Sequence, residues 1–446
     1  MKKTETICAL ATAVGQSGIG IVRISGPLSQ FIAKQVLGVE LEPRVAYYGD
    51  FCDQEGDKVD KGVAIFFPSP NSYTGEDIIE LQGHGGMSVL RCLLETASHF
   101  GARLAEPGEF SKRAFLNGKM DLVQAEAVQD LIQASSDKSA RCAVRSLSGE
   151  FSAKINNILS SIISLRVFVE ATIDFSDEEI DFLESDEVLS KIESLKQELQ
   201  DILDSASQGA ILREGLHVAI AGKPNSGKSS LLNSLTKQPS AIVTDIAGTT
   251  RDILKETIQI DGLPLHIIDT AGLHNSDDII EKEGIRRAHA EIDSADVVLL
   301  VYEAQEQSAD YSILPDLITN KPIVTIRNKI DLTGEEAGIT EQEKQFSISL
   351  SAKTGNGVDL LREILIKIAG YNPVGEEVYL ARKRHLLAIS SALKYIKIAI
   401  RQLESGASEL VAEDLRQASM SLGAITGEFS SDDLLGEIFS SFCIGK

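Results

Sequence analysis

A nine-residue stretch, GKPNSGKSS, begins at Gly222 and carries the residue types that bind nucleotide phosphates. It fits the pattern G-x-x-x-x-G-K-S, in which glycines let successive backbone N–H groups point at phosphate oxygens. Lys228 would reach the β- and γ-phosphate oxygens, and the Ser229 hydroxyl would ligate Mg²⁺. A predicted strand precedes the loop and a predicted helix follows it, with its positive end toward the phosphates. This context makes a chance glycine loop the weaker interpretation.

Two segments after this loop are expected to sense the γ-phosphate. Residues 269–272 (Asp-Thr-Ala-Gly) end a predicted strand, where Asp269 would hold Mg²⁺ through a water molecule and Gly272 would let the backbone approach the phosphate. Thr250, in the run DIAGTTRD, is the expected second Mg²⁺ ligand of a first switch that closes only when the γ-phosphate is present. The alternative is a surface threonine pair, but the position between the loop and Asp269 favours the switch.

Two later motifs indicate which base is bound. Residues 328–331 (Asn-Lys-Ile-Asp) end another predicted strand, and Asp331 can accept hydrogen bonds from the two donor nitrogens on the edge of guanine. Adenine lacks that donor pair and would leave the carboxylate unsatisfied, so the pattern predicts GTP rather than ATP. Residues 351–353 (Ser-Ala-Lys) are expected to support the base. The phosphate loop and the motifs at residues 269–272, 328–331 and 351–353 follow one another in the order found in translation-factor-type GTPase domains, which this part of the chain resembles.

The second switch lacks the glutamine that orients the attacking water in Ras-like GTPases. Leu273 stands there and cannot position water. Asn225 could coordinate a monovalent cation beside the phosphates, where potassium would neutralise developing charge as an arginine finger does. Glu281, after the second switch, could orient the water. Asn225 alone does not establish a cation site, because many such phosphate loops contain asparagine.

The expected nucleotide contacts come from all of these motifs. They are Asn225, Ser226, Gly227, Lys228, Ser229, Ser230, Thr244, Asp245, Ile246, Ala247, Gly248, Thr249, Thr250, Asp269, Thr270, Ala271, Gly272, Asn328, Lys329, Asp331, Ser351, Ala352 and Lys353. Lys228 and Glu281 are the expected catalytic groups of this site.

The pattern of strand-like and helical runs divides the chain into domains that would position these residues. Residues 1–118 mix short strand-like runs with glycine turns, as at 20–24 and 63–67. Residues 119–209 and 371–446 are helical in pattern. Residues 210–370 alternate buried-strand runs with helical segments, which is typical of a parallel α/β sheet. We therefore predict an N-terminal α/β or α+β domain and an all-α helical domain, with a Ras-like P-loop GTPase domain inserted into the latter.

Specific runs support this division. Ile155, Ile158, Leu159, Ile162 and Ile163 recur at a helical spacing and should share one helix face. Four buried-strand runs are expected in the inserted domain, at residues 218–220, 267–268, 297–301 and 323–326.

Composition limits the classes of function. The 446 residues carry a formal net charge of -23, so the chain is not a bulk binder of phosphate backbones, and contact with a nucleic acid needs a local basic surface or a partner. Candidate surfaces are residues 112–113 with Lys119, and residues 382–385, although short basic clusters are usually solvated faces. Five cysteines without paired spacing, no secretory signal and no apolar run of about 20 residues favour a cytoplasmic protein without a membrane span.

Many GTPases share the nucleotide motifs, so the flanking domains are more specific indicators of the family. They resemble the tRNA modification GTPases of the MnmE (TrmE) family, which belongs to the TrmE-Era-EngA-YihA-Septin-like GTPases. The resemblance spans essentially the whole chain. It is carried by SYTGEDIIELQGHGG at residues 72–86, PGEFSKRAFLNGKMDL at 107–122, DIAGTTRD at 245–252 and the terminal Cys-Ile-Gly-Lys.

The resemblance implies an N-terminal domain that binds tetrahydrofolate and forms a homodimer. The expected folate contacts are Arg23, Glu80, Lys119 and Lys446, with 5,10-methylenetetrahydrofolate or a 5-formyl analogue as the ligand. A pterin ring offers a donor pair that the Glu80 carboxylate can accept. Without the resemblance, Arg23 and Glu80 would be interpreted as ordinary surface charges.

The implied activity is that of a potassium-activated GTPase, with Mg²⁺ on Ser229 and Thr250 and K⁺ on Asn225, Thr244, Ile246 and Thr249. With a flavoprotein partner, MnmG or GidA, the family adds an aminomethyl or carboxymethylaminomethyl group to C5 of the wobble uridine of certain tRNAs. The partner, which forms a heterotetramer with the homodimer, brings FAD and much of the tRNA surface.

The end of the chain, Phe-Cys-Ile-Gly-Lys, is not a prenylation box, because Gly445 is not aliphatic and lysine is an atypical last residue. The resemblance places it beside the folate, where Cys443 could act as a nucleophile or acid. A buried, unreactive Cys443 next to Phe442 is the alternative.

Two other functions remain open at this point. One is a GTP-dependent ribosome-assembly switch of the Era type, but the G-x-x-G run at residues 83–86 lacks the basic residue of an RNA-binding KH loop. The other is a folate aminomethyltransferase with a merely structural GTPase domain, which the intact nucleotide motifs disfavour.

Overall fold

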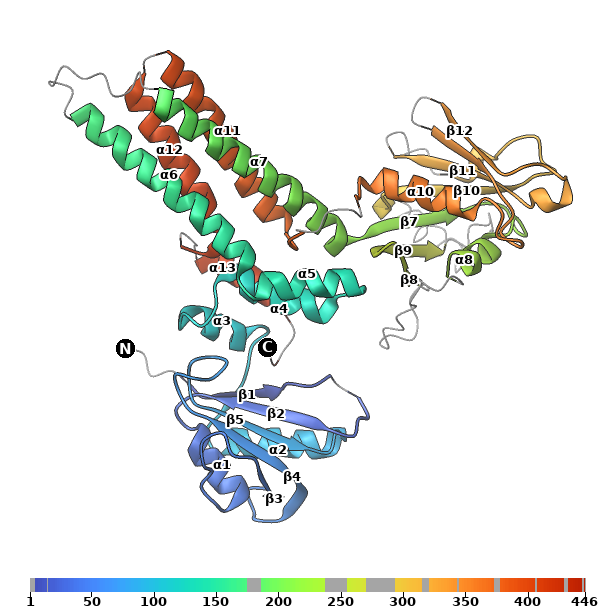
Figure 1. The fold of residues 1–446 in the computed structure, drawn as a ribbon. Coiled ribbons are helices and arrows are strands. Elements are labelled where there is room, and N and C mark those ends of the chain that lie inside the picture. Colours follow the sequence, from blue (N-terminus) through green and yellow to red (C-terminus); the bar gives the residue numbers. More distant parts are fainter. Residues whose placement is uncertain are drawn as a thin grey trace. The chain divides into compact units, whose positions relative to one another are not determined.

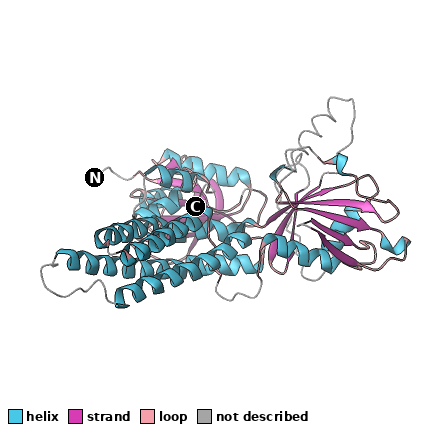
Figure 2. Ribbon diagram, turned by 90° about the horizontal axis from the view of Figure 1, so that it is seen from above, coloured by secondary structure: helices cyan, strands magenta, loops and turns pink. Residues whose placement is uncertain are grey.

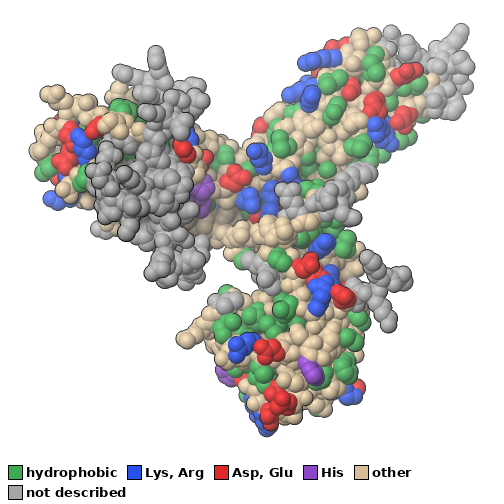
Figure 3. All heavy atoms as spheres, turned by 180° about the vertical axis from the view of Figure 1, so that it is seen from behind, with side chains coloured by type: hydrophobic (Ala, Val, Ile, Leu, Met, Phe, Trp, Pro, Cys, Tyr) green, Lys and Arg blue, Asp and Glu red, His purple; other side chains and the backbone are tan. Residues whose placement is uncertain are grey.

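The computed structural model describes residues 5–13, 15–174, 186–236, 255–269, 293–314, 321–342, 345–372, 378–405, 407–428, 432–442 and 445 (Figure 1). The chain forms two compact units, each discontinuous in sequence. One comprises Met1–Gln129, Leu147–Glu178 and Ser408–Lys446, and the other comprises Asp130–Ser146 and Glu179–Ala407. Within the described part of the chain, every helix is too short or too polar to cross a membrane. Acidic and basic side chains are intermixed on the face that Figure 3 shows.

The first unit contains a six-stranded sheet with the order β3-β4-β5-β2-β1-β6. All neighbouring strands are antiparallel except β1 and β6, which are parallel. Residues on one face of the sheet, such as Val22, Leu81 and Phe66, are buried in a core that α1 and α2 complete. The elements are β1 (Ile7–Leu10), β2 (Gly20–Ser25), α1 (Ser29–Leu37), β3 (Tyr47–Cys52), β4 (Lys58–Phe67), β5 (Ile78–Gly83), α2 (Met87–His99) and β6 (Arg103–Leu104).

The remaining elements of this unit are helical, namely α3 (Glu109–Leu116), α4 (Leu122–Gln133, in this unit as far as Gln129), α6 (Glu150–Asp174), α12 (Ser408–Thr426) and α13 (Asp432–Ser440). Helix α6 packs along α12 (Figure 1). Of the predicted α6 face, four residues are buried, but Ile163 is 39% exposed, so including it was wrong. At about 100° per residue, Ile163 lies about 80° around the helix from Ile155, at the edge of the buried stripe.

The second unit contains a seven-stranded sheet with the order β12-β13-β11-β10-β7-β9-β8. The five central strands are parallel, and the edge strands β12 and β8 are antiparallel to their neighbours. All four predicted strand runs lie in this sheet, and the predicted P-loop fold class is confirmed. The elements are β7 (Leu216–Ala221), α8 (Lys228–Thr236), β8 (Lys255–Ile260), β9 (Leu263–Asp269), β10 (Val297–Glu303), β11 (Ile323–Asn328), β12 (Gly338–Gln342), β13 (Gln345–Ser349) and α10 (Val358–Ala369).

Three further helices of the described residues belong to this unit. Figure 2 shows the helices and strands of the whole chain from above. The three helices are α5 (Asp137–Leu147, in this unit as far as Ser146), α7 (Asp186–Glu214) and α11 (Lys383–Glu404). Helix α7 packs along α11. The predicted boundary at 209/210 lies inside α7, because the helix continues to Glu214. It ends at Gly215, whose φ of 68° favours glycine, and β7 begins one residue later.

Candidate functional site

The phosphate loop joins the end of β7 to the start of α8, as its sequence predicts. A side chain at Gly222 would collide with the Val301 carbonyl oxygen, and one at Gly227 would collide with the Asn328 amide nitrogen. Asn225 has a φ of 64°, a left-handed conformation that asparagine tolerates better than most residues. The buried Ser226 hydroxyl has no hydrogen-bond partner among the described residues. These constraints favour a curled backbone, the kind of loop that can direct successive N–H groups toward an anion.

The two lysines of this loop have different environments. The Lys228 Nζ donates hydrogen bonds to the carbonyl oxygens of Gly222, at 2.7 Å, and Lys223, at 3.0 Å. Its ammonium group therefore lies over the loop that would enclose the phosphates. The Lys223 Nζ instead lies 3.1 Å from a Glu306 carboxylate oxygen and 3.7 Å from one of Asp310, and the hydrogen bond to Glu306 raises the pKa of Lys223.

Asn328 joins three of the predicted motifs through its side-chain amide. Its Nδ2 donates to the Ser226 carbonyl oxygen at 2.9 Å, and its Oδ1 accepts from the backbone N–H groups of Lys329, at 2.8 Å, and Ala352, at 3.0 Å. The residue is 1% exposed, so these bonds form away from water. The phosphate loop and the two base-recognition loops are thus held together by one buried side chain.

Asp331, the predicted guanine-binding residue, is exposed. Its Oδ1 accepts a hydrogen bond of 2.6 Å from the Ser351 hydroxyl, which fixes one carboxylate oxygen and leaves the other for a base. Lys329 lies between Asn328 and Asp331, and its Nζ pairs with Glu303 at 2.7 Å. Glu303, at the end of β10, was not identified from the sequence, although a carboxylate that ends a buried strand is a usable signal.

The structure describes only some of the remaining residues that were predicted for the nucleotide site. The backbone of Asp269 ends β9 and pairs with Ile220 of β7, two residues before Gly222. Ser229 and Ser230 follow Lys228 in the first turn of α8, and Lys353 follows Ala352 in the base-recognition loop. Residues 244–250, residues 270–272 and Glu281 lie outside the described residues. The predicted potassium ligands, Asn225 included, the predicted magnesium ligands Ser229 and Thr250 and the water-orienting role of Glu281 all stay predictions.

Arg23 and Glu80, two of the predicted folate contacts, are partners in the first sheet. They face each other across β2 and β5, with Arg23 Nη2 2.8 Å and Nε 2.9 Å from the same Glu80 oxygen, Oε1. Their side chains are 19% and 15% exposed. The guanidinium carbon lies 5.4 Å from the centre of the Tyr73 ring and 5.9 Å from that of Phe110. The pair is therefore not an ordinary surface ion pair.

The aromatic residues Tyr73 and Phe110 were not predicted as site residues, although Tyr73 lies inside the SYTGEDIIELQGHGG motif. Burial raises the pKa of the Tyr73 phenol, which hydrogen-bonds the Ser111 hydroxyl at 2.9 Å. Lys119 is exposed, and its side chain lies beside Gly75, two residues from Tyr73. One loop thus contacts both Arg23 and Lys119.

Near the end of the chain, Gly445 packs against the carbonyl of Leu10 on β1, the neighbour of β2. Because Ala9 of β1 pairs with Arg23, this part of the tail lies close to the Arg23–Glu80 pair. Cys443 and Lys446 themselves lie outside the described residues, and their roles stay predictions.

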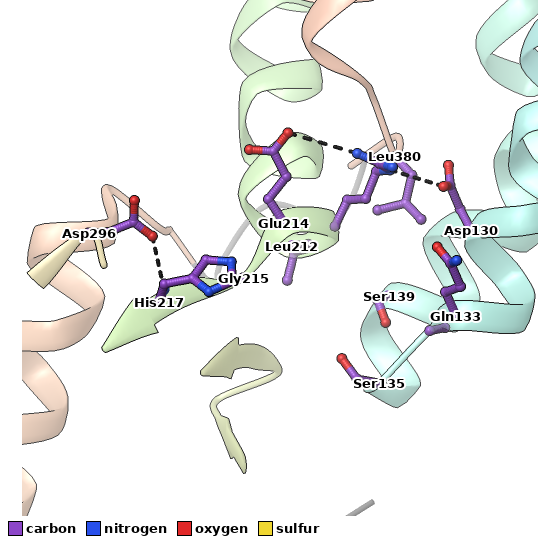
Figure 4. Close-up of a pocket in the computed structure, with 12 residues that line it drawn as sticks. Asp130, Gln133, Ser135, Ser139, Leu212, Glu214, Gly215, His217, Asp296 and Leu380 are labelled. Carbon is purple, nitrogen blue, oxygen red and sulfur yellow. Dashed lines mark hydrogen bonds and ion pairs between the residues drawn. The ribbon is translucent and has the colours of Figure 1, made fainter. Parts of the chain in front are cut away.

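A third polar cluster, in the second unit, was not identified from the sequence. A cavity of about 360 Å³ lies between the end of α4, the start of α5, the end of α7 and the starts of β7 and β10, and Figure 4 shows residues that line it. On its wall, Asp130 is 5% exposed and its Oδ1 lies 2.9 Å from Arg213 and 2.9 Å from Arg382. Arg213 precedes the first strand of the sheet and Arg382 precedes α11, so Asp130 holds the chain where it enters the α/β part and where it leaves it.

Comparison with known proteins gives full-length matches. A family model described as "MnmE helical domain" matches residues 122–443, and one described as "GTP-binding protein TrmE N-terminus" matches residues 6–119. The tRNA modification GTPase MnmE of Ruthia magnifica subsp. Calyptogena magnifica is 62% identical over 447 residues, which cover 100% of both chains. The chain belongs to the MnmE family of tRNA modification GTPases. The MnmE of Hydrogenovibrio crunogenus is 53% identical over 445 residues, which cover 99% of each chain.

The family assignment places both sites in context. In this MnmE-family chain, the Arg23–Glu80 pair lies within the TrmE N-terminus match, and the nucleotide loops lie in a P-loop GTPase fold. A solved structure, the G domain of the T. maritima FeoB iron transporter, is 25% identical with a TM-score of 0.27, covering 34% of this chain and 98% of that one. The fold assignment rests on the sheet order and the full-length MnmE relatives.

Proposed function

We propose that this MnmE-family chain is a potassium-activated GTPase that works in the cytoplasm as a homodimer. With a flavoprotein of the MnmG (GidA) type it forms a heterotetramer that adds an aminomethyl or carboxymethylaminomethyl group to C5 of the wobble uridine of certain tRNAs. Tetrahydrofolate provides the one-carbon unit, and FAD comes only through the partner. The observation that carries the proposal is the buried Asn328 bridge between the phosphate loop and the base loops, in a chain 62% identical to a tRNA modification GTPase over its full length.

The described residues fit a guanine nucleotide with Mg²⁺. Close approach of Gly222 and Gly227 to neighbouring groups leaves a side-chain-free cradle, and the Lys228 ammonium group already lies over it. Asp331 has one oxygen fixed by Ser351 and would use its carboxylate to accept from the guanine edge. Ser229, with Thr250, would hold Mg²⁺, which supplies positive charge at the β- and γ-phosphates. Lys228 would stabilise the charge that develops during hydrolysis.

Folate binding is proposed for the Arg23–Glu80 pair and its aromatic neighbours. Arg23 donates to Oε1 of Glu80, and the Gln82 amide donates to Oε2 at the long distance of 3.4 Å, so Oε2 has capacity for a further donor. A pterin ring would meet both this acceptor and the Tyr73 and Phe110 rings that flank Arg23. Lys119 and Lys446 would neutralise the glutamate tail. Cys443, two residues before Gly445 in the chain, is the proposed reactive group of this site.

The test of the overall function is mass spectrometry of tRNA nucleosides from a strain that lacks this protein. We expect the aminomethyl-type wobble uridines to disappear, to return with the wild-type chain and not to return with Lys228→Ala. Normal wobble uridine together with accumulated ribosomal precursors would contradict the proposal and support an Era-type switch.

The potassium role can be tested through Asn225 without straining the loop. Because φ is 64° at this position, Asn225→Gly removes the side chain while keeping the backbone conformation. We expect wild-type GTP hydrolysis to be stimulated by KCl over NaCl by about 10-fold or more, and the variant to hydrolyse GTP at similar rates in both salts. Lys223→Ala, in the same loop but paired with Glu306, should keep the potassium dependence. Equal wild-type rates in the two salts would rule out the cation role.

The folate role can be tested with Glu80→Gln, which keeps the side-chain shape and removes the charge. We expect the affinity for 5-formyltetrahydrofolate to fall at least about 10-fold, which corresponds to about 1.4 kcal/mol, while GDP affinity stays unchanged. The control is Asp50→Asn on the same sheet, whose carboxylate pairs with Lys58 at 2.6 Å. Calorimetric titration measures both ligands, and an unaltered folate isotherm for Glu80→Gln would refute the assignment.

A further inference from the structure

Helix α11 is basic in a protein that is strongly acidic. Between Lys383 and Glu404 it contains five basic residues, and Glu404 at its end is the helix's single acidic residue. The whole chain, by contrast, has a formal net charge of -23. A local concentration of positive charge of this kind is where a polyanion would be attracted to an otherwise repelling surface.

The charges on α11 are arranged along one face. Its buried residues, including Ile389, Leu393 and Ile396, face the core, while the residues spaced three and four apart on the opposite side are exposed. We call this exposed stripe the α11 face, and it consists of Lys383, Leu387, Ser390, Lys394, Lys397 and Arg401.

The cations of the α11 face differ from the ion-paired lysines elsewhere in this unit. Other exposed lysines of this unit, such as Lys191 and Lys367, form ion pairs with Glu187 and Glu341. In the described parts of the chain, no carboxylate lies within ion-pair distance of Lys394, Lys397 or Arg401. Unpaired surface cations of this kind keep their full charge for an external partner.

The same three cations line one wall of a groove between α7 and α11. The groove has a volume of about 460 Å³, and Gln200 and Leu203 form the α7 wall. Gln200 is neutral, and its amide donates to the Asp204 carboxylate at 2.9 Å. From Lys394 to Arg401 the helix rises about 10 Å, so three positive charges follow one another along the groove. This geometry suits an extended chain of phosphates, lying on the α11 side.

We propose that the α11 face binds the phosphate backbone of the tRNA. The inference rests on the proposed tRNA substrate and adds where on this acidic chain that substrate makes contact. A nucleic acid is favoured over a protein partner because the surface offers separated cations with a single exposed aliphatic residue, Leu387, and protein interfaces need a larger apolar centre. Contacts to phosphates position a nucleic acid without reading its sequence, so tRNA identity would be read elsewhere.

The test is the triple variant Lys394→Gln, Lys397→Gln and Arg401→Gln in the full chain. Fluorescence anisotropy with labelled tRNA, repeated over a range of KCl concentrations, gives both affinity and its salt dependence. Because each phosphate contact releases about 0.7 to 0.9 counterions, we expect the slope of log affinity against log salt to fall by about 2 to 3 and the affinity to fall at least about 10-fold.

The control is Lys191→Gln, Lys196→Gln and Lys367→Gln, which removes the same net charge from lysines that are ion-paired within the chain. It should bind tRNA nearly as the wild type does, and both variants should hydrolyse GTP normally, which verifies folding. An α11 variant with wild-type affinity and slope overturns the proposal, as does one that binds tRNA normally but no longer binds the flavoprotein. If the purified wild-type chain binds no tRNA, although deleting the protein still abolishes the wobble uridine modification, this proposal is overturned and the proposed function stands.

Discussion

Lys228→Ala is expected to lower the rate of GTP hydrolysis by about 10²-fold or more. The Lys228 ammonium group is held over the phosphate loop by the carbonyl oxygens of Gly222 and Lys223, at 2.7 and 3.0 Å. It is therefore positioned before a nucleotide arrives, so little reorganisation is needed when negative charge develops on the γ-phosphate. Alanine removes that charge without altering the glycines that shape the loop. Rates of phosphate release under saturating GTP measure the effect.

A lysine five residues earlier provides the matched control. Lys223 belongs to the same loop and has the same charge, but its ammonium group pairs with Glu306 and Asp310 instead of lying over the loop. Lys223→Ala should therefore retain hydrolysis within about 3-fold of wild type, since exposed ion pairs contribute little. Comparable losses in the two variants would show that the loop needs net charge alone, and the assigned role of Lys228 would be wrong.

Asp130→Ala is expected to lower the free energy of unfolding of the second unit by about 3 to 5 kcal/mol, the usual cost of breaking a buried ion pair from one side. The Asp130 carboxylate is 5% exposed and neutralises two guanidinium groups, each 2.9 Å from the same oxygen. Without it, Arg213 and Arg382, whose side chains are 26% and 13% exposed, would lose their shared counterion and repel each other. Because these arginines flank the α/β segment in sequence, the loss should also loosen its connection to α4.

Calorimetry with excess GDP should detect this change as a lower midpoint temperature of one unfolding transition. Urea titration followed by circular dichroism should show one unfolding transition shifted to a lower urea concentration. Asp137→Ala is the control, because Asp137 lies on the same segment but is exposed, and its removal should cost less than about 0.5 kcal/mol. Replacing Asp130, Arg213 and Arg382 together by apolar residues should recover much of the stability, as it does for other buried charge clusters. An Asp130→Ala variant as stable as wild type would mean that the two arginines are well hydrated.

Four strands of the second sheet and the phosphate loop could be predicted from the sequence, because each is determined by a run of contiguous residues. An apolar run followed by G-x-x-x-x-G-K-S leaves few alternatives for the backbone. Glycine is needed at 222 and 227 because a side chain at either position would collide with a neighbouring residue, as it would in any loop of this shape. Helix faces were less certain, since Ile163 fits the spacing of its neighbours but lies at the edge of the stripe that α12 covers.

The sequence by itself therefore determined the kinds of domain, the order of the nucleotide motifs and the preference for guanine. Only the tertiary structure decided which distant residues meet: Asn328 with Ser226 and Ala352, Arg23 with Glu80 between two aromatic rings, and Asp130 with Arg213 and Arg382. The physical reason is that local backbone preferences depend on neighbours in the chain. Pairing of buried polar groups, in contrast, depends on how whole strands and helices pack, and no spacing in the sequence records that.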